Sequence, residues 1–308
     1  MPAHAEFPYW LVDVFTEQPF EGNALAVLPR AENMTDAAMQ AIAREFNLSE
    51  TVFGCGLAPN GTPRVRIFTP AKEMRFAGHP TVGAAFVLRE EGLVARDAAS
   101  FALNELVGDV PIRVDSETPP RIWLRTPPMT WRETFDRARC AEALGLAAAD
   151  LLSIGPQMLD AGNPTLFVAL KNPEAVDRAW LDAGGMRKLR GNRAEPFCVF
   201  VFAATLQGAY SRMFAPDYGI VEDPATGSST GPLAAYMMRH GLIATASGTR
   251  MISEQGAKLG RRSLLHVHIC GESGCDGIEV GGHVTAVGRG TLHVPAHFLA
   301  PQRHGAAR

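Results

Sequence analysis

A weak internal duplication constrains the fold of this 308-residue chain more than any other feature of its sequence. Four short segments recur in the same order, displaced by 140 to 149 residues, which is close to half the chain length. The matched pairs are Gly22-Asn23 and Gly162-Asn163, Arg66 to Pro70 and Arg212 to Pro216, Gly78 and Gly227, and Gly92 and Gly241. One match could arise by chance, but four matches in order predict two homologous halves.

The halves are expected to meet between residues 115 and 125, where the chain becomes rich in proline. We therefore predict one domain over residues 1–118, completed by the C-terminal segment 294–308, and a second domain over residues 119–293. Residues 302–308 have the composition of a frayed tail.

Strands are expected in both halves, because β-branched and aromatic residues alternate in several segments. These segments are TVFG, RVRIFTP and SFALNE in the first half, and FCVFVFA, LLHVHIC and IEVGGHVTAVGRGTL in the second. Residues 34–46 have apolar residues at helical spacing. Residues 81–88 and 231–238 are apolar around most of a helix circumference, which predicts two buried helices. The pattern indicates an α+β fold with two similar domains, each a curved, mostly antiparallel β-sheet or barrel around a central helix.

Composition restricts the class of partner. Hydrophobic residues make up 46% of the chain and the net charge is −3, which is typical of a globular protein and argues against nucleic acid as a partner. The densest basic run, residues 187–193, is expected to be a solvated helix end or loop rather than a binding patch. There is no apolar stretch of 18 residues and no signal peptide, so we expect no membrane association and a cytoplasmic location.

The five cysteines are expected to be reduced thiols. Cys270 and Cys275 flank a glycine-containing gap that is better explained as a turn than as a disulfide loop. No cysteine or histidine spacing indicates a metal site, and no glycine-rich phosphate loop is present. Phosphate-bearing cofactors therefore have no predicted binding site.

The approaches to the two buried helices indicate an anion site. Residues 76–79 and 223–230 are rich in glycine and hydroxyl side chains, and Pro80 and Pro232 suggest first helical positions. Helix N-termini expose backbone N–H groups that bind anions. Either motif alone is better explained as ordinary capping. Their placement at matching points of both halves favours a carboxylate ligand in a shared cleft.

Three titratable residues are candidates for proton transfer. Glu50 lies at the start of a predicted apolar strand, where a solvated edge carboxylate is the ordinary interpretation. If it points into a dry cleft, desolvation would raise its pKa toward neutrality and make it a useful acid and base. His79 and Asp223 lie at the two helix starts, so all three could converge on one pocket.

Taken together, these motifs resemble the PhzF-like family, relatives of diaminopimelate epimerase. The segments that carry the resemblance are Asp13-Val14-Phe15, Phe20 to Asn23, Asn47 to Thr51, Phe76 to Thr81, Glu222 to Ser228, Glu254-Gln255-Gly256 and Gly260-Arg261. They extend through nearly the whole chain. The resemblance implies two similar α+β domains with the active site between them, which agrees with the duplication.

The resemblance also implies an activity. The family's named member isomerises trans-2,3-dihydro-3-hydroxyanthranilate: a glutamate removes a proton from ring carbon 3 and returns one to ring carbon 1, and the enol then forms a ketone. By motif, Glu50 is similar to that glutamate, and His79 and Asp223 to its partners. The residues implied to bind the substrate are Gly78, Gly227, Ser228 and Asn23. No metal or organic cofactor is implied, and the family is commonly homodimeric.

The sequence differs from the epimerases at one point that matters for mechanism. Those relatives use a cysteine at each helix start, whereas this chain has Gly78-His79 and Gly227-Ser228 there. The main expectation is therefore an isomerase with one acid/base on a small carboxylate substrate. Two alternatives stay open: an amino- or hydroxy-acid epimerase or racemase with His79 or Asp223 as second base, and a carboxylate-binding protein without turnover.

Overall fold

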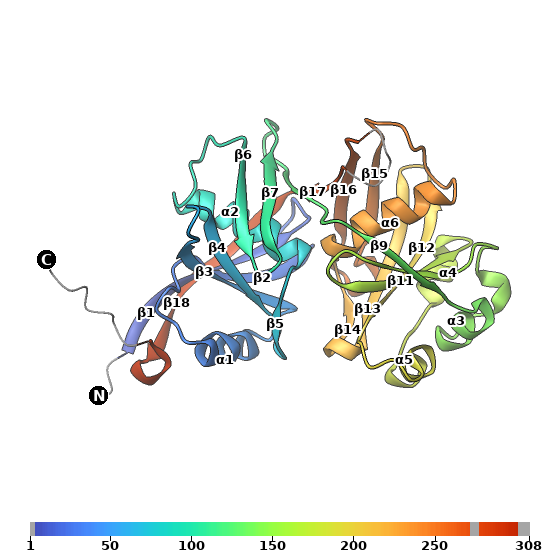
Figure 1. Ribbon diagram of the computed structural model, residues 1–308, viewed down its shortest axis with the longest axis horizontal. Coiled ribbons are helices and arrows are strands. Elements are labelled where there is room, and N and C mark those ends of the chain that lie inside the picture. Colours follow the sequence, from blue (N-terminus) through green and yellow to red (C-terminus); the bar gives the residue numbers. More distant parts are fainter. Residues whose placement is uncertain (1–3, 272–276, 301–308) are drawn as a thin grey trace, which may run out of the picture.

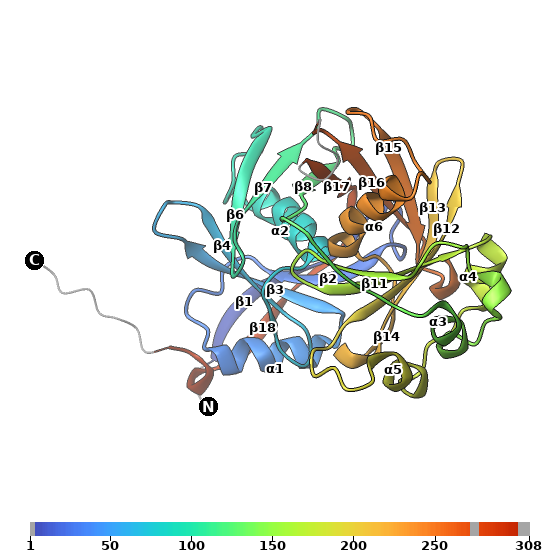
Figure 2. The same cartoon turned by 45° about the vertical axis from the view of Figure 1, so that its right-hand side comes forward.

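The computed structural model describes residues 4–271 and 277–300, and these form two lobes, each a curved sheet around one helix (Figures 1 and 2). We call them the N-terminal lobe (β1 to β8, β18, α1 and α2) and the C-terminal lobe (β9 to β17 and α3 to α6). Cys275 and residues 301–308, which entered the sequence-based expectations, lie outside the described residues.

The N-terminal lobe contains nine strands and two helices. They are β1 (His4–Val14), β2 (Asn23–Leu28), α1 (Asp36–Phe46), β3 (Glu50–Leu57), β4 (Pro63–Phe68), β5 (Glu73–Met74), α2 (Gly78–Glu90), β6 (Ser100–Glu105), β7 (Gly108–Val114), β8 (Ile122–Arg125) and β18 (Val284–Pro295).

The C-terminal lobe follows the same plan with three outer helices in place of one. Its elements are β9 (Thr130–Thr134), α3 (Arg137–Ala143), β10 (Gln157–Asp160), β11 (Pro164–Leu170), α4 (Pro173–Arg178), α5 (Ala183–Arg190), β12 (Cys198–Thr205), β13 (Gly208–Ala215), β14 (Ile220–Asp223), α6 (Gly227–Arg239), β15 (Arg250–Gln255), β16 (Ser263–Ile269) and β17 (Ile278–Gly282). Four short 3-10 turns complete the chain: Ala148–Asp150, Pro216–Tyr218, Ala257–Leu259 and Ala296–Phe298.

Strand pairing confirms the predicted duplication and fold class. The N-terminal lobe pairs its strands in the order β18-β1-β2-β3-β4-β6-β7-β8. The C-terminal lobe pairs them as β9-β10-β11-β12-β13-β15-β16-β17. In both lobes all of these pairs are antiparallel except the third and the fifth. The parallel pairs are β2–β3 and β4–β6 in the N-terminal lobe, and β11–β12 and β13–β15 in the C-terminal lobe. The short strands β5 and β14 add a matching edge hairpin to β4 and β13.

The two sheets are continuous, because β8 pairs with both β7 and β17. Residues 278–292, expected as one strand, form two: β17 stays in the C-terminal lobe, and after His283 the chain crosses to the N-terminal lobe as β18. There β18 pairs with β1 along its whole length, so the pairing begins at Val284 rather than at the expected residue 294. The proposed division into two domains at residues 118 and 294 stays a prediction.

The central helices α2 and α6 are buried on nearly all sides, as their composition predicts. Their starts differ from the expectation drawn from proline. Both helices begin at the glycine, so Pro80 is the third residue of α2 and Pro232 the sixth of α6. Proline is tolerated at Pro80 because the first turn of a helix leaves its N–H groups without intrahelical partners. Pro232 lies inside the helix, so the prediction that it marks the first position was wrong.

The outer helices cover the opposite faces of the sheets. The helix α1 packs on β3 and β4, with Thr35 as N-cap, and α3, α4 and α5 form a second core in the C-terminal lobe. The basic run spans the end of α5 and the turn after it, and Lys188, Arg190 and Arg193 pair with acidic side chains. None of the helices in the described ranges is long and apolar enough to span a bilayer.

Candidate active site

The starts of α2 and α6 touch each other at their glycines. A Cβ atom on Gly78 would lie 2.4 Å from the backbone nitrogen of Ser228, and one on Gly227 would lie 3.2 Å from the carbonyl carbon of Gly78. Only glycine permits this backbone approach. Neither helix start has a side-chain cap. Two uncapped positive helix ends therefore meet at the junction of the lobes, as the anion-site hypothesis requires.

Two asparagines tie each lobe to the helix of the other lobe. The side-chain amide of Asn23 donates to the carbonyl oxygen of Ala225 at 3.0 Å, and that of Asn163 donates to the carbonyl oxygen of Phe76 at 3.1 Å. Ala225 and Phe76 each lie two residues before the glycine that begins the helix. The duplicated Gly-Asn motif is thus a reciprocal latch across the lobe junction.

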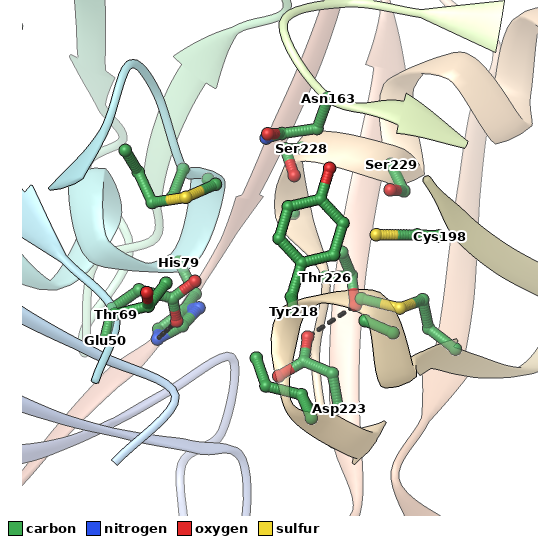
Figure 3. Close-up of a pocket in the computed structure, with 17 residues that line it drawn as sticks. Glu50, Thr69, His79, Asn163, Cys198, Tyr218, Asp223, Thr226, Ser228 and Ser229 are labelled. Carbon is green, nitrogen blue, oxygen red and sulfur yellow. Dashed lines mark hydrogen bonds and ion pairs between the residues drawn. The ribbon is translucent and has the colours of Figure 1, made fainter. Parts of the chain in front are cut away.

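A cavity opens beside these helix starts, between the lobes (Figure 3). The N-terminal lobe lines it with Glu50, Thr69, Met74, Ala77, Gly78 and His79. The C-terminal lobe lines it with Asn163, Cys198, Met213, Ala215, Tyr218, Ile220, Asp223, Thr226, Gly227, Ser228 and Ser229. Six of the seven predicted site residues line this cavity. Asn23, the seventh, is buried behind it.

Glu50 and His79 face each other on the wall of the N-terminal lobe. Oε2 of Glu50 lies 3.5 Å from Nε2 of His79, and neither atom has a hydrogen-bond partner among the described residues. The side chains are 12% and 4% exposed, so Glu50 is not the solvated edge residue that its position alone would favour. Burial raises the pKa of Glu50 well above its usual value, and the charge of Asp223 raises it further.

His79 is neutral, and its neighbours determine which ring nitrogen carries the hydrogen. Burial lowers the pKa of His79 to about 3. The amide nitrogen of Asn23 lies 3.2 Å from Nδ1 of the ring and donates to Asp223 Oδ1 at 2.8 Å and to a carbonyl oxygen. Because that nitrogen carries two hydrogens and cannot accept one, we assign Nδ1 as the unprotonated atom. The ring hydrogen is therefore on Nε2, the atom that faces Glu50.

Asp223 lies at the end of β14 on the opposite wall and is held by four polar groups. Oδ1 accepts from Asn23 at 2.8 Å and from the Ser49 hydroxyl at 3.3 Å, and Oδ2 accepts from the Thr226 hydroxyl at 2.5 Å. The amide of Gln255 donates to the Asp223 carbonyl oxygen at 2.7 Å. Burial raises the pKa of Asp223 to about 6, against the hydrogen bonds, which lower it. Asp223 is thus fixed in orientation, and its pKa is raised.

Several lining residues were not predicted from the sequence, among them Thr69, Asn163, Cys198, Tyr218 and Ser229. Asn163 could have been found from the duplication, since it matches Asn23. Tyr218 lies in the 3-10 turn between β13 and β14, and this connection has the same length as its counterpart between β4 and β5. No sequence pattern marks it.

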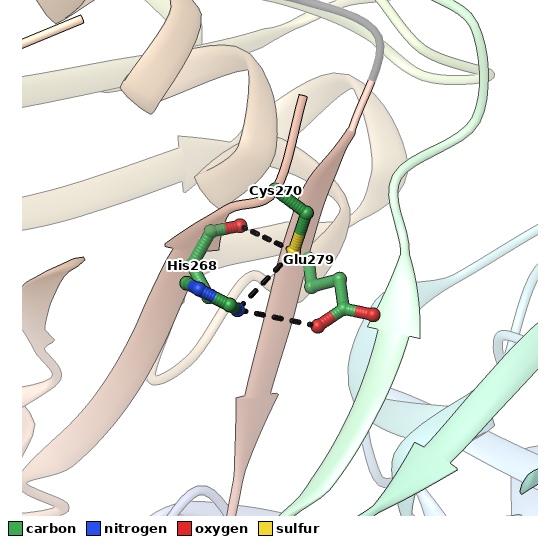
Figure 4. Close-up of side chains that lie close together, drawn as sticks. All are labelled: His268, Cys270 and Glu279. Carbon is green, nitrogen blue, oxygen red and sulfur yellow. Dashed lines mark hydrogen bonds and ion pairs between the residues drawn. The ribbon is translucent and has the colours of Figure 1, made fainter. Parts of the chain in front are cut away.

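A second cluster lies away from the cavity: His268 on β16, Cys270 directly after that strand and Glu279 on β17 (Figure 4). Nδ1 of His268 lies 3.1 Å from the Cys270 sulfur and 3.7 Å from Oε2 of Glu279. The guanidinium of Arg113 already binds this carboxylate oxygen, at 3.0 Å through Nε and at 2.5 Å through Nη2. Because that cation neutralises the only acidic member of the cluster, we assign no metal to it.

The chain matches the model of a family described as PhzC-PhzF, phenazine biosynthesis-like protein, over residues 12–290. It is 32% identical to a trans-2,3-dihydro-3-hydroxyanthranilate isomerase of Pseudomonas fluorescens, covering 92% of this chain and 98% of the relative. It is 35% identical to an uncharacterized isomerase of Mesorhizobium japonicum, with 93% and 98% coverage.

Solved structures agree with this relationship. A predicted epimerase from Pseudomonas aeruginosa has a TM-score of 0.77 and 33% identity, covering 93% of this chain and 99% of that chain. A PhzF-family protein from Bacillus anthracis has a TM-score of 0.83 at 24% identity, with 94% and 99% coverage. A hydroxyproline epimerase from Agrobacterium vitis shares the fold at a TM-score of 0.65 and 12% identity, with 96% and 94% coverage. The chain therefore belongs to the PhzC-PhzF family of phenazine biosynthesis-like proteins, and it is an isomerase.

Proposed function

We propose that this isomerase shifts a proton within a small cyclic carboxylate of the trans-2,3-dihydro-3-hydroxyanthranilate type, with Glu50 as its single acid and base. The observation that carries the proposal is the position of Glu50: a buried cavity carboxylate, with Oε2 unpartnered and a raised pKa. A relative that this chain covers almost completely bears the name of that isomerase.

The substrate carboxylate would bind at the junction of the two helix starts. Gly78, Gly227 and Ser228 provide backbone N–H groups at uncapped N-termini, and Ser228 adds a hydroxyl group. Two helix dipoles directed at one point favour an anion there. The ring of the substrate would then extend into the cavity between Glu50 and the opposite wall.

The proposed reaction conserves all atoms of the substrate. The Glu50 carboxylate takes the proton from ring carbon 3, and the electron pair of that C–H bond enters the ring and shifts a double bond. The resulting carboxylic acid returns a proton to ring carbon 1 on the same face, which gives an enol that tautomerises to the ketone. A carboxyl group with a raised pKa suits both half-reactions, because it is neither too weak a base nor too weak an acid.

The other polar residues would position these groups. Nε2 of His79 lies 3.5 Å from Oε2 of Glu50, and Asn23 contacts both that ring and Asp223. We propose that His79 and Asp223 orient the substrate and the Glu50 carboxyl. Asn23 would act through them, because it does not line the cavity.

An amino- or hydroxy-acid epimerase is the second candidate, favoured by one observation: Asp223 places a second carboxyl group on the wall opposite Glu50. An epimerase needs a base on each face of the substrate. Both carboxylate oxygens of Asp223 already accept hydrogen bonds, however, which makes it a weaker base than Glu50. The single-base shift is therefore the better supported reaction.

Turnover in heavy water with trans-2,3-dihydro-3-hydroxyanthranilate tests the proposal. The wild-type enzyme is expected to form product with deuterium at ring carbon 1. The Glu50→Gln variant should lose about 10³-fold in kcat, because a general base typically contributes 10² to 10⁴. Glu45→Gln, which alters an exposed glutamate of α1, is the matched control and should retain full activity.

Three results would contradict the proposal or redirect it. Full turnover by Glu50→Gln would remove Glu50 as the proton carrier. Loss of the α-hydrogen from an amino-acid panel, with no turnover of the ring substrate, would establish the epimerase instead. Binding of a carboxylate without any proton exchange would indicate a protein that has kept the cavity and lost turnover.

We also propose that the enzyme acts in the cytoplasm as a homodimer. Support comes from the four cysteines of the described residues, which are free, and from the resemblance to a family that is commonly homodimeric. Light scattering during size-exclusion chromatography should give twice the monomer mass; a monomer at micromolar concentration would contradict the dimer.

A further inference from the structure

Cys198 has the position in the C-terminal lobe that Glu50 has in the N-terminal lobe. Each is the first residue of its strand, β12 or β3. On the parallel neighbour strand, Glu50 lies opposite Leu25 and Cys198 lies opposite Thr165. Leu25 and Thr165 are each the second residue after the duplicated Gly-Asn motif.

The antiparallel neighbour strands give the same match. Thr51 follows Glu50 and Val199 follows Cys198, and each lies opposite a phenylalanine on the antiparallel neighbour strand. These two phenylalanines correspond to each other in the duplication. The pairs are Thr51 with Phe68 and Val199 with Phe214. Two independent registers therefore relate Cys198 to Glu50 by the pseudo-two-fold symmetry of the molecule.

The Cys198 side chain lines the same cavity as Glu50, from the other wall (Figure 3). It is 7% exposed and is a free cysteine. His79 lines the same cavity and is 4% exposed. Its ring atom Nε2 has no hydrogen-bond partner among the described residues. This buried, unpartnered N–H group indicates that the space between the walls is built for a ligand rather than for packing.

The thiol of Cys198 cannot serve as a second base at neutral pH. Burial raises its pKa far above the usual value, and the negative charges of Asp223 and Glu50 raise it further. Only a thiolate accepts a proton, so the wall opposite Glu50 presents a small, neutral and polarisable group at the symmetric position.

We propose that Cys198 is a substrate-contacting residue that covers the ring face opposite Glu50 and confines proton exchange to the Glu50 face. This inference rests on the proposed function and deepens it. The substrate is a flat ring held between a carboxyl group and a thiol, and the second position that symmetry offers for a base is occupied by a group that does not transfer protons. Ring substituents that project toward Cys198 are excluded by the wall.

Two substitutions and a matched control test this contact. Cys198→Ala shortens the wall and should raise KM for trans-2,3-dihydro-3-hydroxyanthranilate by about fivefold to tenfold, with kcat changed by less than about threefold. Cys198→Leu fills the cavity and should weaken binding of anthranilate, measured by calorimetry, by about tenfold or more. Cys140→Ala removes a thiol that is fully buried in the second core, away from the cavity, and should change neither quantity.

The outcomes separate this inference from the proposed function. Unchanged KM in Cys198→Ala together with unchanged anthranilate binding in Cys198→Leu would overturn the contact. A collapse of kcat in Cys198→Ala, with loss of deuterium incorporation, would make Cys198 a proton carrier and also overturn it. If the wild-type protein binds anthranilate but turns over no ring substrate, and Cys198→Leu still weakens binding, the proposed function fails and the contact stands. A wild-type protein that binds neither compound overturns both.

Discussion

The two lobes have the same strand order and the same parallel and antiparallel pairs, yet they present different side chains at equivalent positions. Glu50 corresponds to Cys198, and His79 corresponds to Ser228. The glycines that begin α2 and α6 are the same in both lobes. The comparison shows where the duplicated sequence is constrained: backbone contact between the helices requires identity, whereas the walls of the cavity have diverged.

One ion pair recurs at equivalent positions of the two lobes. Arg66 forms a two-pronged ion pair with Glu73, and Arg212 forms one with Glu222. The duplicated Gly-Asn motif ties each lobe to the other. Each copy of the duplicated unit therefore supplies one helix start and one wall of the cavity. The proposed proton transfer depends on the difference between the two walls.

Substitutions of the two latch asparagines should have unequal effects, and after the loss of Glu50 this is the largest effect we expect. Asn23→Ala removes hydrogen bonds to Ala225, Asp223 and His79 together, whereas Asn163→Ala removes one bond to a backbone carbonyl. Losing the orientation of two site residues should lower kcat/KM by about 10²-fold. The Asn163 variant should lose about 1 kcal/mol of stability and keep most of its activity.

Steady-state kinetics and thermal unfolding of both variants measure this difference, and each serves as the control of the other. Equal losses of activity would show that both asparagines act only by holding the lobes together. A larger loss in the Asn163 variant would contradict the asymmetry assigned to the site.

Much of this arrangement could be predicted from the sequence. The duplication, the buried central helices and the proton-transfer group Glu50 all follow from short segments and their order. The match between Glu50 and Cys198 could not be predicted in this way. The connection between β11 and β12, which contains α4 and α5, is longer than the connection between β2 and β3, which contains α1. The offset changes along the repeat, so no single displacement aligns the two residues. The burial of Glu50 could not be predicted from the sequence either, because it depends on the position of the opposite lobe.

A second divergent pair, Glu105 and Gln255, tests the comparison through stability. Each ends its strand, β6 or β15, beneath the start of a central helix. The Thr81 hydroxyl lies 2.7 Å from the Ala77 carbonyl oxygen and 2.6 Å from Oε1 of Glu105. The Thr81 hydroxyl is the donor in both contacts. Burial raises the pKa of Glu105 to about 8, against the hydrogen bond from Thr81, which lowers it.

The sign of the pH effect follows from this raised pKa. Between about 4.5 and 8 the folded protein binds a proton at Glu105 that the unfolded chain has released, so stability falls as pH rises through that range. Glu105→Gln removes the titration and mimics Gln255. Urea unfolding should show little change at pH 5 and a gain of about 2–4 kcal/mol near pH 9.

The reverse substitution, Gln255→Glu, is the matched control. The Gln255 amide donates to the Asp223 carbonyl oxygen and to the Thr226 hydroxyl, which an ionised carboxylate cannot do. This variant should be destabilised at neutral pH. A Glu105→Gln variant whose gain does not grow with pH would show that Glu105 is ionised in the folded protein.

The smallest effect we expect is a displacement of the pH profile, and it tests whether the two walls act on each other. The base must be ionised to remove the substrate proton, so kcat/KM should fall as pH drops through the raised pKa of Glu50. Burial is the main cause of that raised pKa, and the charge of Asp223 is the second.

Asp223→Asn removes only the second cause of the raised pKa, which is the charge. The acid limb should therefore move toward lower pH, while the pKa of Glu50 stays above 4.5 because the cavity still excludes water. Asp97→Asn, an exposed carboxylate in the loop after α2, should leave the limb in place. An acid limb that does not move in Asp223→Asn would mean that the pKa of Glu50 depends on the N-terminal lobe alone. An acid limb that moves would show that the C-terminal lobe, which has no base at the symmetric position, raises the pKa of the base in the N-terminal lobe.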